Sequence, residues 1–246
     1  MKAGYGLPMT SHLKLTIRRA NDRGHADHGW LNSWHTFSFG DYHDPSHMGF
    51  RSLRVINDDR VAAMGGFPTH PHRNMEIFSY VLEGSLAHED SMGNKRVLKP
   101  GEIQLMRAGS GVRHSEYNPS SKDGAHFLQV WITPDTSDLM PAYTEWTPKM
   151  GEDHAPKTLV ISADGRDGSA TIAQDALIYL LKPDVGTRVE HELLPGRGLW
   201  LHVATGAVSI DGIKLLAGDA ASLEEAARLV ITADDANTQV ILFDLK

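Results

Sequence analysis

The 246-residue sequence contains no cysteine. Disulfide bonds and thiolate metal sites are therefore excluded, so any bound metal takes its ligands from histidine, carboxylate, backbone or water. Such ligands favour iron, manganese, nickel, cobalt, copper or zinc. The sequence also lacks an apolar run of the ~20 residues that span a bilayer. Because residues 1–8 lack the hydrophobic core of a signal peptide, we expect no membrane partner and a cytoplasmic location.

An excess of positive charge is missing too, since the formal net charge is −7. This balance argues against nucleic acid as a direct partner, because the phosphate backbone attracts basic surfaces. Histidine is the residue type that stands out. The chain has 14 histidines, and 11 of them precede residue 130. We therefore expect any chemistry to reside in the first half of the chain.

Short apolar and β-branched runs, separated by Gly and Pro turns, fill most of the chain. They include residues 77–82, 103–106 and 127–132 in the first half, and residues 199–203 and 240–245 in the second. Many short strands at close spacing are typical of barrels and sandwiches. The sequence therefore predicts an all-β fold.

The strand pattern divides into two similar halves. Residues 80–84 resemble residues 201–206, which indicates an internal duplication of one β unit. Between the halves, polar sequence with several prolines and few strand signals predicts a connecting segment at residues 135–157. The expected domains are therefore residues 1–134 and residues 158–246.

Two short motifs are the candidates for chemistry, His70-Pro71-His72 and, further along, His114-Ser115-Glu116. Residues two apart in a strand point to the same face, so each motif can present two ligand atoms on one side of a sheet. Three imidazoles and one carboxylate inside a barrel form a divalent-metal site with room for substrate. Glu76 is an even number of residues from His72, so the spacing leaves Glu116 or Glu76 as the carboxylate.

These segments resemble the pirin family of two-domain cupins. The likeness rests on residues 70–73, 80–84 and 108–116, and on the segment 23–39. It implies two tandem cupin-type (jelly-roll-like) β-barrels, with one divalent metal ion per chain in the first. The resemblance names the metal ligands as His70, His72, His114 and Glu116. It leaves four further residues as candidates to surround the site or line its pocket: Glu76, His35, Phe67 and Asn118.

The second half differs at the corresponding positions. Aligning the glycine turns of the two halves puts Glu192 and Leu194 where His70 and His72 stand. His191 falls one residue out of register, which would turn its side chain to the other face. We therefore expect the C-terminal domain to be metal-free and to pack on the first domain and close its pocket.

Apart from the two motifs, seven histidines of the first half lack a partner at ligand spacing: His25, His28, His35, His43, His47, His88 and His126. A single histidine in a strand is usually packed or exposed rather than a ligand. We expect structural roles for all seven, with His35 the candidate to line the site.

The resemblance implies a metal-dependent dioxygenase that cleaves a flavonol such as quercetin at the 2,3 bond with O₂ and releases CO. Glu116 would be both ligand and catalytic base, and the partners would be a small aromatic substrate and O₂. Two alternatives remain open. One is a non-enzymatic, redox-sensing regulatory module that binds a protein partner. The other is a cupin-type isomerase of a small anionic substrate, which needs a basic cluster such as Arg73 and Arg113.

Overall fold

A computed structural model describes residues 12–148 and 155–246. Within these ranges the regular structure is β, apart from two 3-10 turns, η1 (Ala20–Asp22) and η2 (Arg166–Gly168). The predicted all-β fold class is therefore confirmed. In this described part, no helix is long and apolar enough to cross a membrane.

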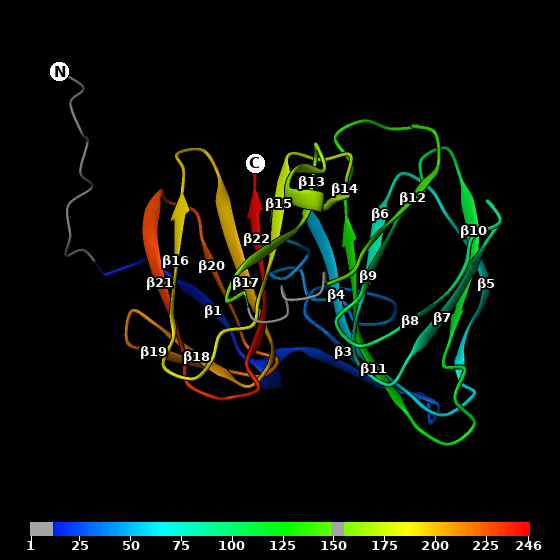
Figure 1. Ribbon diagram of the computed structural model, residues 1–246, viewed down its shortest axis with the longest axis horizontal. Helices are drawn as coiled ribbons and strands as arrows, with labels where there is room; N and C mark the ends of the chain where they lie inside the picture. The colour runs from blue at the N-terminus through cyan, green and yellow to red at the C-terminus, as the bar shows by residue number, and fades with distance from the viewer. Residues whose placement is uncertain (1–11, 149–154) are drawn as a thin grey trace.

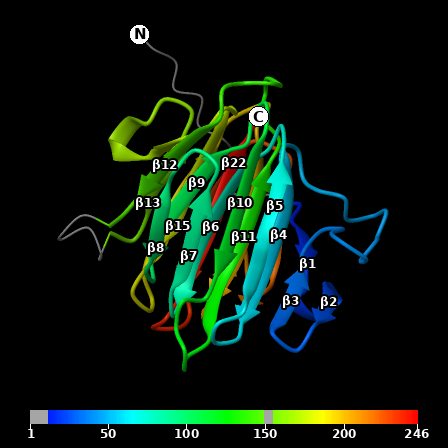
Figure 2. The same cartoon turned by 90° about the vertical axis from the view of Figure 1, so that its right-hand side faces the viewer.

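The first half forms a seven-stranded sheet that packs against a four-stranded sheet (Figure 1). In spatial order, the larger sheet contains β12 (Ala142–Trp146), β9 (Ile103–Arg107), β6 (Glu76–Glu83), β11 (Ala125–Ile132), β4 (Leu53–Val61), β3 (Leu31–His35) and β2 (Gly24–Asp27). The smaller sheet contains β5 (Gly66–His72), β10 (Val112–Tyr117), β7 (Leu86–Asp90) and β8 (Lys95–Leu98). Figure 2 views the molecule from the side of this smaller sheet.

The second half repeats this plan. Its larger sheet contains β1 (Thr16–Arg18), β20 (Ala220–Leu223), β17 (Gly198–Thr205), β22 (Gln239–Leu245), β15 (Ala176–Leu181), β13 (Thr158–Ser162) and β14 (Ala170–Thr171). Its smaller sheet contains β16 (Arg188–Leu193), β21 (Ala227–Ala233), β18 (Ala207–Ile210) and β19 (Ile213–Leu216). The order β16-β21-β18-β19 matches β5-β10-β7-β8 strand for strand. The internal repeat read from the sequence is therefore present in the topology.

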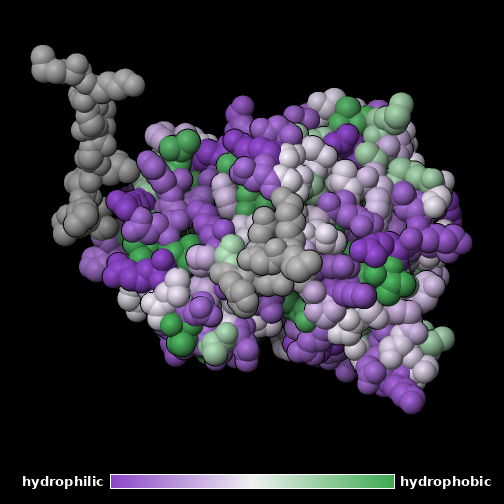
Figure 3. All heavy atoms as spheres, in the orientation of Figure 1, coloured by the Kyte–Doolittle hydropathy of each residue, from purple (hydrophilic) through white to green (hydrophobic). Residues whose placement is uncertain are grey.

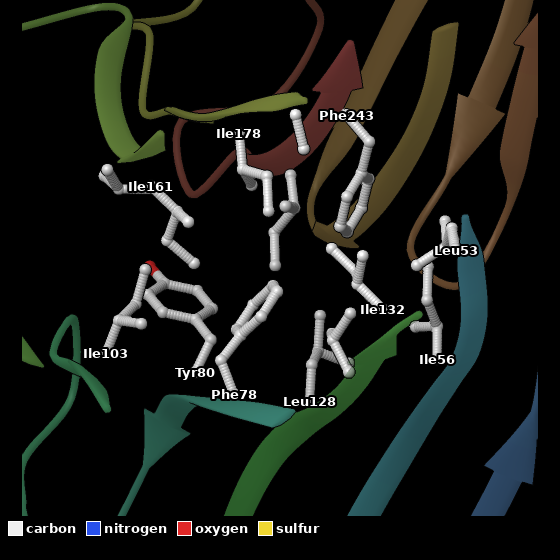
Figure 4. Close-up of a cluster of buried hydrophobic side chains, with 14 of the residues drawn as sticks. Leu53, Ile56, Phe78, Tyr80, Ile103, Leu128, Ile132, Ile161, Ile178 and Phe243 are labelled. Carbon is white, nitrogen blue, oxygen red and sulfur yellow. The ribbon is translucent and has the colours of Figure 1, made fainter. Parts of the chain in front are cut away.

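The two seven-stranded sheets face each other, and their side chains form a shared apolar core between the halves. Phe78, Tyr80 and Leu128 of the first half point towards Ile178 and Phe243 of the second (Figure 4). All five side chains are essentially inaccessible to water. Aromatic and branched side chains bury large apolar areas, so this interface stabilises the two barrels as a pair.

β6 shows why the sequence of a central strand is apolar on both faces. Phe78 and Tyr80 belong to the core between the halves, whereas Ile77 and Val81 pack inside the first barrel. A strand covered on both sides reads as a continuous apolar run rather than as an alternation. The exception is Ser79, which points into the barrel and takes part in the site described below.

Two segments lie differently from the sequence prediction. β1 pairs with β20, so the start of the described chain adds a strand to the sheet of the second half. β12 lies within the predicted connecting segment, yet it pairs with β9 at the edge of the first large sheet. Edge strands are short and need only one partner, so their sequence signal is weak. The rest of the predicted connection includes residues 149–154, which lie outside the described ranges.

The surface shown in Figure 3 is mostly hydrophilic, and apolar residues occur there as small separate areas. Scattered apolar surface of this kind is normal for a water-exposed face. The concentration of polar and aromatic groups that identifies the site lies inside the first barrel.

Candidate metal centre

The two histidine motifs lie side by side because β5 and β10 are antiparallel neighbours. His70 is the Cα partner of His114, and the register shifts between His114 and Glu116. Close approach of the strands depends on Gly66, where an added Cβ would lie 2.3 Å from Tyr117 Cβ. The register brings residues that are more than 40 positions apart onto one face of the small sheet.

The imidazoles of His70, His72 and His114 form a compact cluster. Their ring centroids are 4.5 to 4.8 Å apart, and one ring nitrogen of each lies within 4.8 Å of the other two. His70 Nδ1 is 2.8 Å from the Pro68 carbonyl oxygen, so Nδ1 carries the proton and Nε2 keeps its lone pair. That Nε2 is 3.1 Å from His114 Nε2.

The protonation states of His72 and His114 allow both rings to bind a metal cation. Burial, helped by the neighbouring His114 and His70, lowers the pKa of His72 to about 4. Burial, with His70 and His88 nearby, lowers the pKa of His114 to about 3. Both rings are therefore neutral at physiological pH. Neutral imidazole is the form that binds a metal ion.

Glu116 lies two residues beyond His114 on β10. Its carboxylate accepts hydrogen bonds from Ser79 Oγ at 2.8 Å and from Gln129 Nε2 at 2.6 Å. One of its oxygens lies within 4.8 Å of ring nitrogens of His114 and His88. The two groups of potential ligands therefore share His114, rather than forming one cluster of four.

These residues fit a divalent ion. Two nitrogen ligands of one ion, each at about 2.1 Å, lie roughly 3.0 to 3.4 Å apart, which matches the spacing of His70 and His114. Hydrogen bonds to a ligating carboxylate and to the outer nitrogen of a ligating histidine hold such groups in position. Ser79, Gln129 and the Pro68 carbonyl provide these contacts. The site can hold one metal ion.

His88 is a residue that the sequence prediction left out. It is buried on β7, opposite Glu116, with its ring centroid 5.3 Å from that of His114. Gln104 Nε2 donates to His88 Nδ1 at 2.9 Å, and Nε2 lies 3.1 Å from Asp90 Oδ2. With both ring nitrogens hydrogen-bonded, His88 packs beside His114. Only the pairing of β7 with β10 brings it there, and no local spacing signals that pairing.

Two of the candidate surrounding residues lie elsewhere. Glu76 shares the face of β6 that carries Phe78, and its Oε1 accepts a hydrogen bond from Arg107 Nε at 2.9 Å. The even spacing from His72 fails because Asn74, with φ 51°, turns the chain between the two strands. Asn118 is buried and donates to the carbonyl oxygens of Val61, Ala62 and Asp123, so it fixes loops rather than lining the pocket.

The other two candidates, His35 and Phe67, line a cavity of about 670 Å³ that also reaches His70 and Glu116. Aromatic side chains form much of its wall: Trp30, Phe39, Tyr42, Phe67 and Trp131. The cavity extends over the inner face of the large sheet, where Ser33, Asn57, Asp59 and Gln129 contribute polar groups. His25 and His28, expected to be structural, border it as well. A volume of this size suits a small organic ligand.

Arg73 and Arg113 lie outside this cavity. They border a separate, shallow depression of about 440 Å³ that also touches His72. Arg73 donates to Asp138 Oδ1 through Nε and Nη2, at 3.1 and 2.8 Å. Its charge is therefore already paired, which weakens the case for a basic anion site.

In the second barrel, the expected orientation of His191 is wrong. His191 was expected to face away from the barrel, but it is buried on β16 between the exposed Glu190 and Glu192. The alignment of the glycine turns therefore assigned His191 to the wrong face of β16. Inside the barrel, His191 Nδ1 is 2.9 Å from Lys157 Nζ, and Nε2 is 3.0 Å from Asp244 Oδ2.

Comparison with known proteins identifies the family. The sequence family described as Pirin matches residues 16–132, and the quercetinase C-terminal cupin domain matches residues 159–245. This chain belongs to the pirin family. The resemblance noted in its sequence and the two-cupin fold are thereby confirmed. A quercetin 2,3-dioxygenase of Escherichia coli K12 is 47% identical over 234 residues, covering 94% of this chain and 98% of that protein.

Solved pirin structures agree with this assignment. The crystal structure of YhhW from Escherichia coli superposes with a TM-score of 0.90 at 46% identity, covering 94% of this chain and 97% of that one. A second structure of YhhW, in complex with nickel(II), has a TM-score of 0.87 at 45% identity and covers 94% and 98%. A metal-binding pirin relative thus has the same fold over nearly the full length.

Proposed function

We propose that this pirin is a metal-dependent dioxygenase that cleaves a flavonol such as quercetin at the 2,3 bond and releases CO. The observation that carries the proposal is the cavity itself, where aromatic walls meet His70 and Glu116. A planar polyphenol fits between such walls, with one polar edge at the metal site. The name of the E. coli relative supports this choice of reaction.

In this proposal His70, His72, His114 and Glu116 hold the ion. A bound divalent ion supplies the Lewis acidity and redox capacity that a dioxygenase needs. Glu116 lines the cavity and accepts the proton of the substrate 3-hydroxyl, while Ser79 and Gln129 keep its carboxylate in place.

Phe67, Trp30 and Trp131 contribute apolar surface against which the flavonol rings pack. Trp30 and Phe67 already form an edge-to-face pair with centroids 5.2 Å apart. Aromatic walls of this kind exclude water from the reacting edge of the substrate and hold its plane fixed.

The isomerase alternative receives little support from the cavity. Among the described residues that line it, none is lysine or arginine. An anionic substrate would instead meet Asp59 and Glu116, whose carboxyl groups oppose negative charge. The cavity therefore favours a neutral aromatic ligand over a sugar phosphate.

The test combines metal analysis with an aerobic assay. We expect about one divalent ion per chain, quercetin-dependent O₂ uptake and CO in the headspace, all lost after chelation and restored by the metal. His70→Ala should lose both metal and activity, because it removes one of three clustered imidazoles.

His12→Ala is the matched control, since His12 is exposed and contacts Asp211 in the second half. This variant should keep its metal and its rate. A metal-loaded protein that consumes no O₂ with any flavonol contradicts the proposal. If a partner protein then co-purifies with it, the regulatory-module alternative gains.

A further inference from the structure

Four polar side chains form a continuous strip on the inner face of the large sheet, away from the metal ligands. Ser33 on β3 is paired with Asp59 on β4, and His35 is paired with Asn57 one step along the same two strands. All four line the cavity. We refer to Ser33, His35, Asn57 and Asp59 as the polar strip.

The strip interrupts an apolar pattern. The next pair along the same strands is Leu31 and Val61, both buried in the apolar core of the first barrel. The side chains of the strip are just as buried, with 2 to 6% of their surface exposed. Packing alone therefore does not account for polar residues at these positions, because apolar ones occupy the adjoining pair.

Two atoms of the strip lack a hydrogen-bond partner among the described residues, His35 Nδ1 and Asn57 Oδ1. Buried polar atoms are nearly always paired, so unpaired ones facing a cavity indicate a ligand that completes them. Ser33 Oγ donates to Asp59 Oδ1 at 2.5 Å, which fixes the carboxyl group in place. Burial raises the pKa of Asp59 to about 7, with Asp58 and Glu116 adding to the effect and Ser33 opposing it.

The chemistry of the strip matches hydroxyl groups. The amide oxygen of Asn57 accepts a hydrogen bond, and a carboxyl group such as Asp59 both donates and accepts. Burial lowers the pKa of His35, so its ring is neutral and offers a donor or an acceptor. A phenolic hydroxyl both donates and accepts, and it carries no charge to desolvate.

We propose that the polar strip recognises hydroxyl groups of a polyhydroxylated aromatic substrate and sets the specificity of this pirin. The strip lies on the large sheet, whereas His70 and Glu116 lie on the small sheet that packs across from it. Packed sheets are about 10 Å apart, a distance that a multi-ring phenol can bridge. This inference rests on the proposed function, because it takes the occupant of the cavity to be the flavonol.

The test measures binding by the metal-loaded protein without oxygen, using quenching of tryptophan fluorescence, since Trp30 and Trp131 line the cavity. The probes are quercetin and two flavonols that each lack the hydroxyl pair of one ring but keep the 3-hydroxyl. Leaving a buried polar group unpaired lowers affinity by roughly 5- to 100-fold. We expect at least one analogue to bind 10-fold or more weakly than quercetin.

Asn57→Leu and Asp59→Leu should bring that affinity ratio close to one, mainly by weakening quercetin binding. Asp59→Asn keeps a polar group at the same position and should retain part of the ratio. Asn32→Leu is the matched control, because Asn32 lies on β3 but points away from the cavity. Metal content and unfolding midpoints of all variants show whether the site is otherwise intact.

The outcomes separate the two proposals. Unchanged ratios in Asn57→Leu and Asp59→Leu overturn the specificity role, even if quercetin is turned over. A ratio that collapses in these variants supports the strip, and if no flavonol then consumes O₂, only the proposed reaction fails. Failure of all three flavonols to bind overturns both.

Discussion

The buried side chain of His202 should make the free energy of unfolding depend on pH by an amount that follows from the structure. It lies on β17 with 1% of its surface exposed, and neither ring nitrogen has a partner among the described residues. Burial lowers its pKa to about 3 from the ordinary value of 6.5, with the charge of Arg23 adding to the effect and Asp58 and Asp219 opposing it. The folded protein therefore holds a neutral ring that the unfolded chain protonates below pH 6.5.

The sign of the pH effect follows from this difference. Because the folded pKa is the lower one, stability is complete above pH 6.5 and is lost as the pH falls towards 3. A pH of 5 is about 1.5 units below the pKa of the histidine in the unfolded chain. Protonation of the unfolded chain therefore lowers the free energy of unfolding by about 2 kcal/mol. His202→Leu, similar in volume, removes this cost.

The assay is urea unfolding of chelated protein at pH 8 and pH 5. We expect the loss of unfolding free energy between these pH values to be about 2 kcal/mol smaller in His202→Leu than in the wild type. The other histidines are the same in both proteins, so their contribution cancels in the comparison. His43→Leu, at an exposed position, should behave as wild type. An identical pH dependence in His202→Leu and wild type would refute the argument.

Three further changes test the site and the interface. Ser79→Ala removes a hydrogen bond to Glu116, and we expect metal affinity to fall by about 10- to 100-fold in a competition titration; unchanged affinity would show that the carboxylate needs no such support. Phe243→Ala opens a cavity between the halves and should lower the free energy of unfolding by about 3–5 kcal/mol, whereas a loss under 1 kcal/mol would mean that the interface repacks freely. Gly66→Ala brings a Cβ against Tyr117 and should reduce both metal content and thermal stability, which calorimetry and metal analysis measure; full metal loading would show that β5 and β10 separate without cost.

The sequence was enough to find the three histidines because their signal is local. The two-residue spacing of His70 and His72 places both on one face of a strand, whatever the rest of the fold. The choice between Glu116 and Glu76 was not local in the same way. It depended on the turn at Asn74, which breaks the alternation that relates Glu76 to His72. Here the resemblance to pirins named the residue that lines the cavity.

The groups around the histidines could not be predicted from the sequence, and the cause is physical. His88, Ser79 and Gln129 come from three strands, and each reaches the site only through the register of one strand against the next. Register is set by the whole pattern of pairing rather than by any short motif. The polar strip is a second case, because Asn57 and Asp59 meet His35 and Ser33 only through the pairing of β4 with β3.

The corresponding strands β5 and β16 each carry histidines inside a barrel, but the groups around these histidines differ. In the first, the neutral imidazole of His72 on β5 lies beside His70 and His114, and these three rings form a cluster that could hold a metal ion. In the second, the ammonium of Lys157 donates to His191 Nδ1 at 2.9 Å and lies 4.6 Å from the centroid of the Tyr179 ring. On its other side, His191 Nε2 lies 3.0 Å from Asp244 Oδ2, and Asp244 also accepts a hydrogen bond from Arg197 Nε, so the chain itself supplies a cation at this carboxylate. A metal ion bound at His191 Nδ1 would have to displace Lys157. The two barrels therefore share a fold but surround their interior histidines with different charged groups.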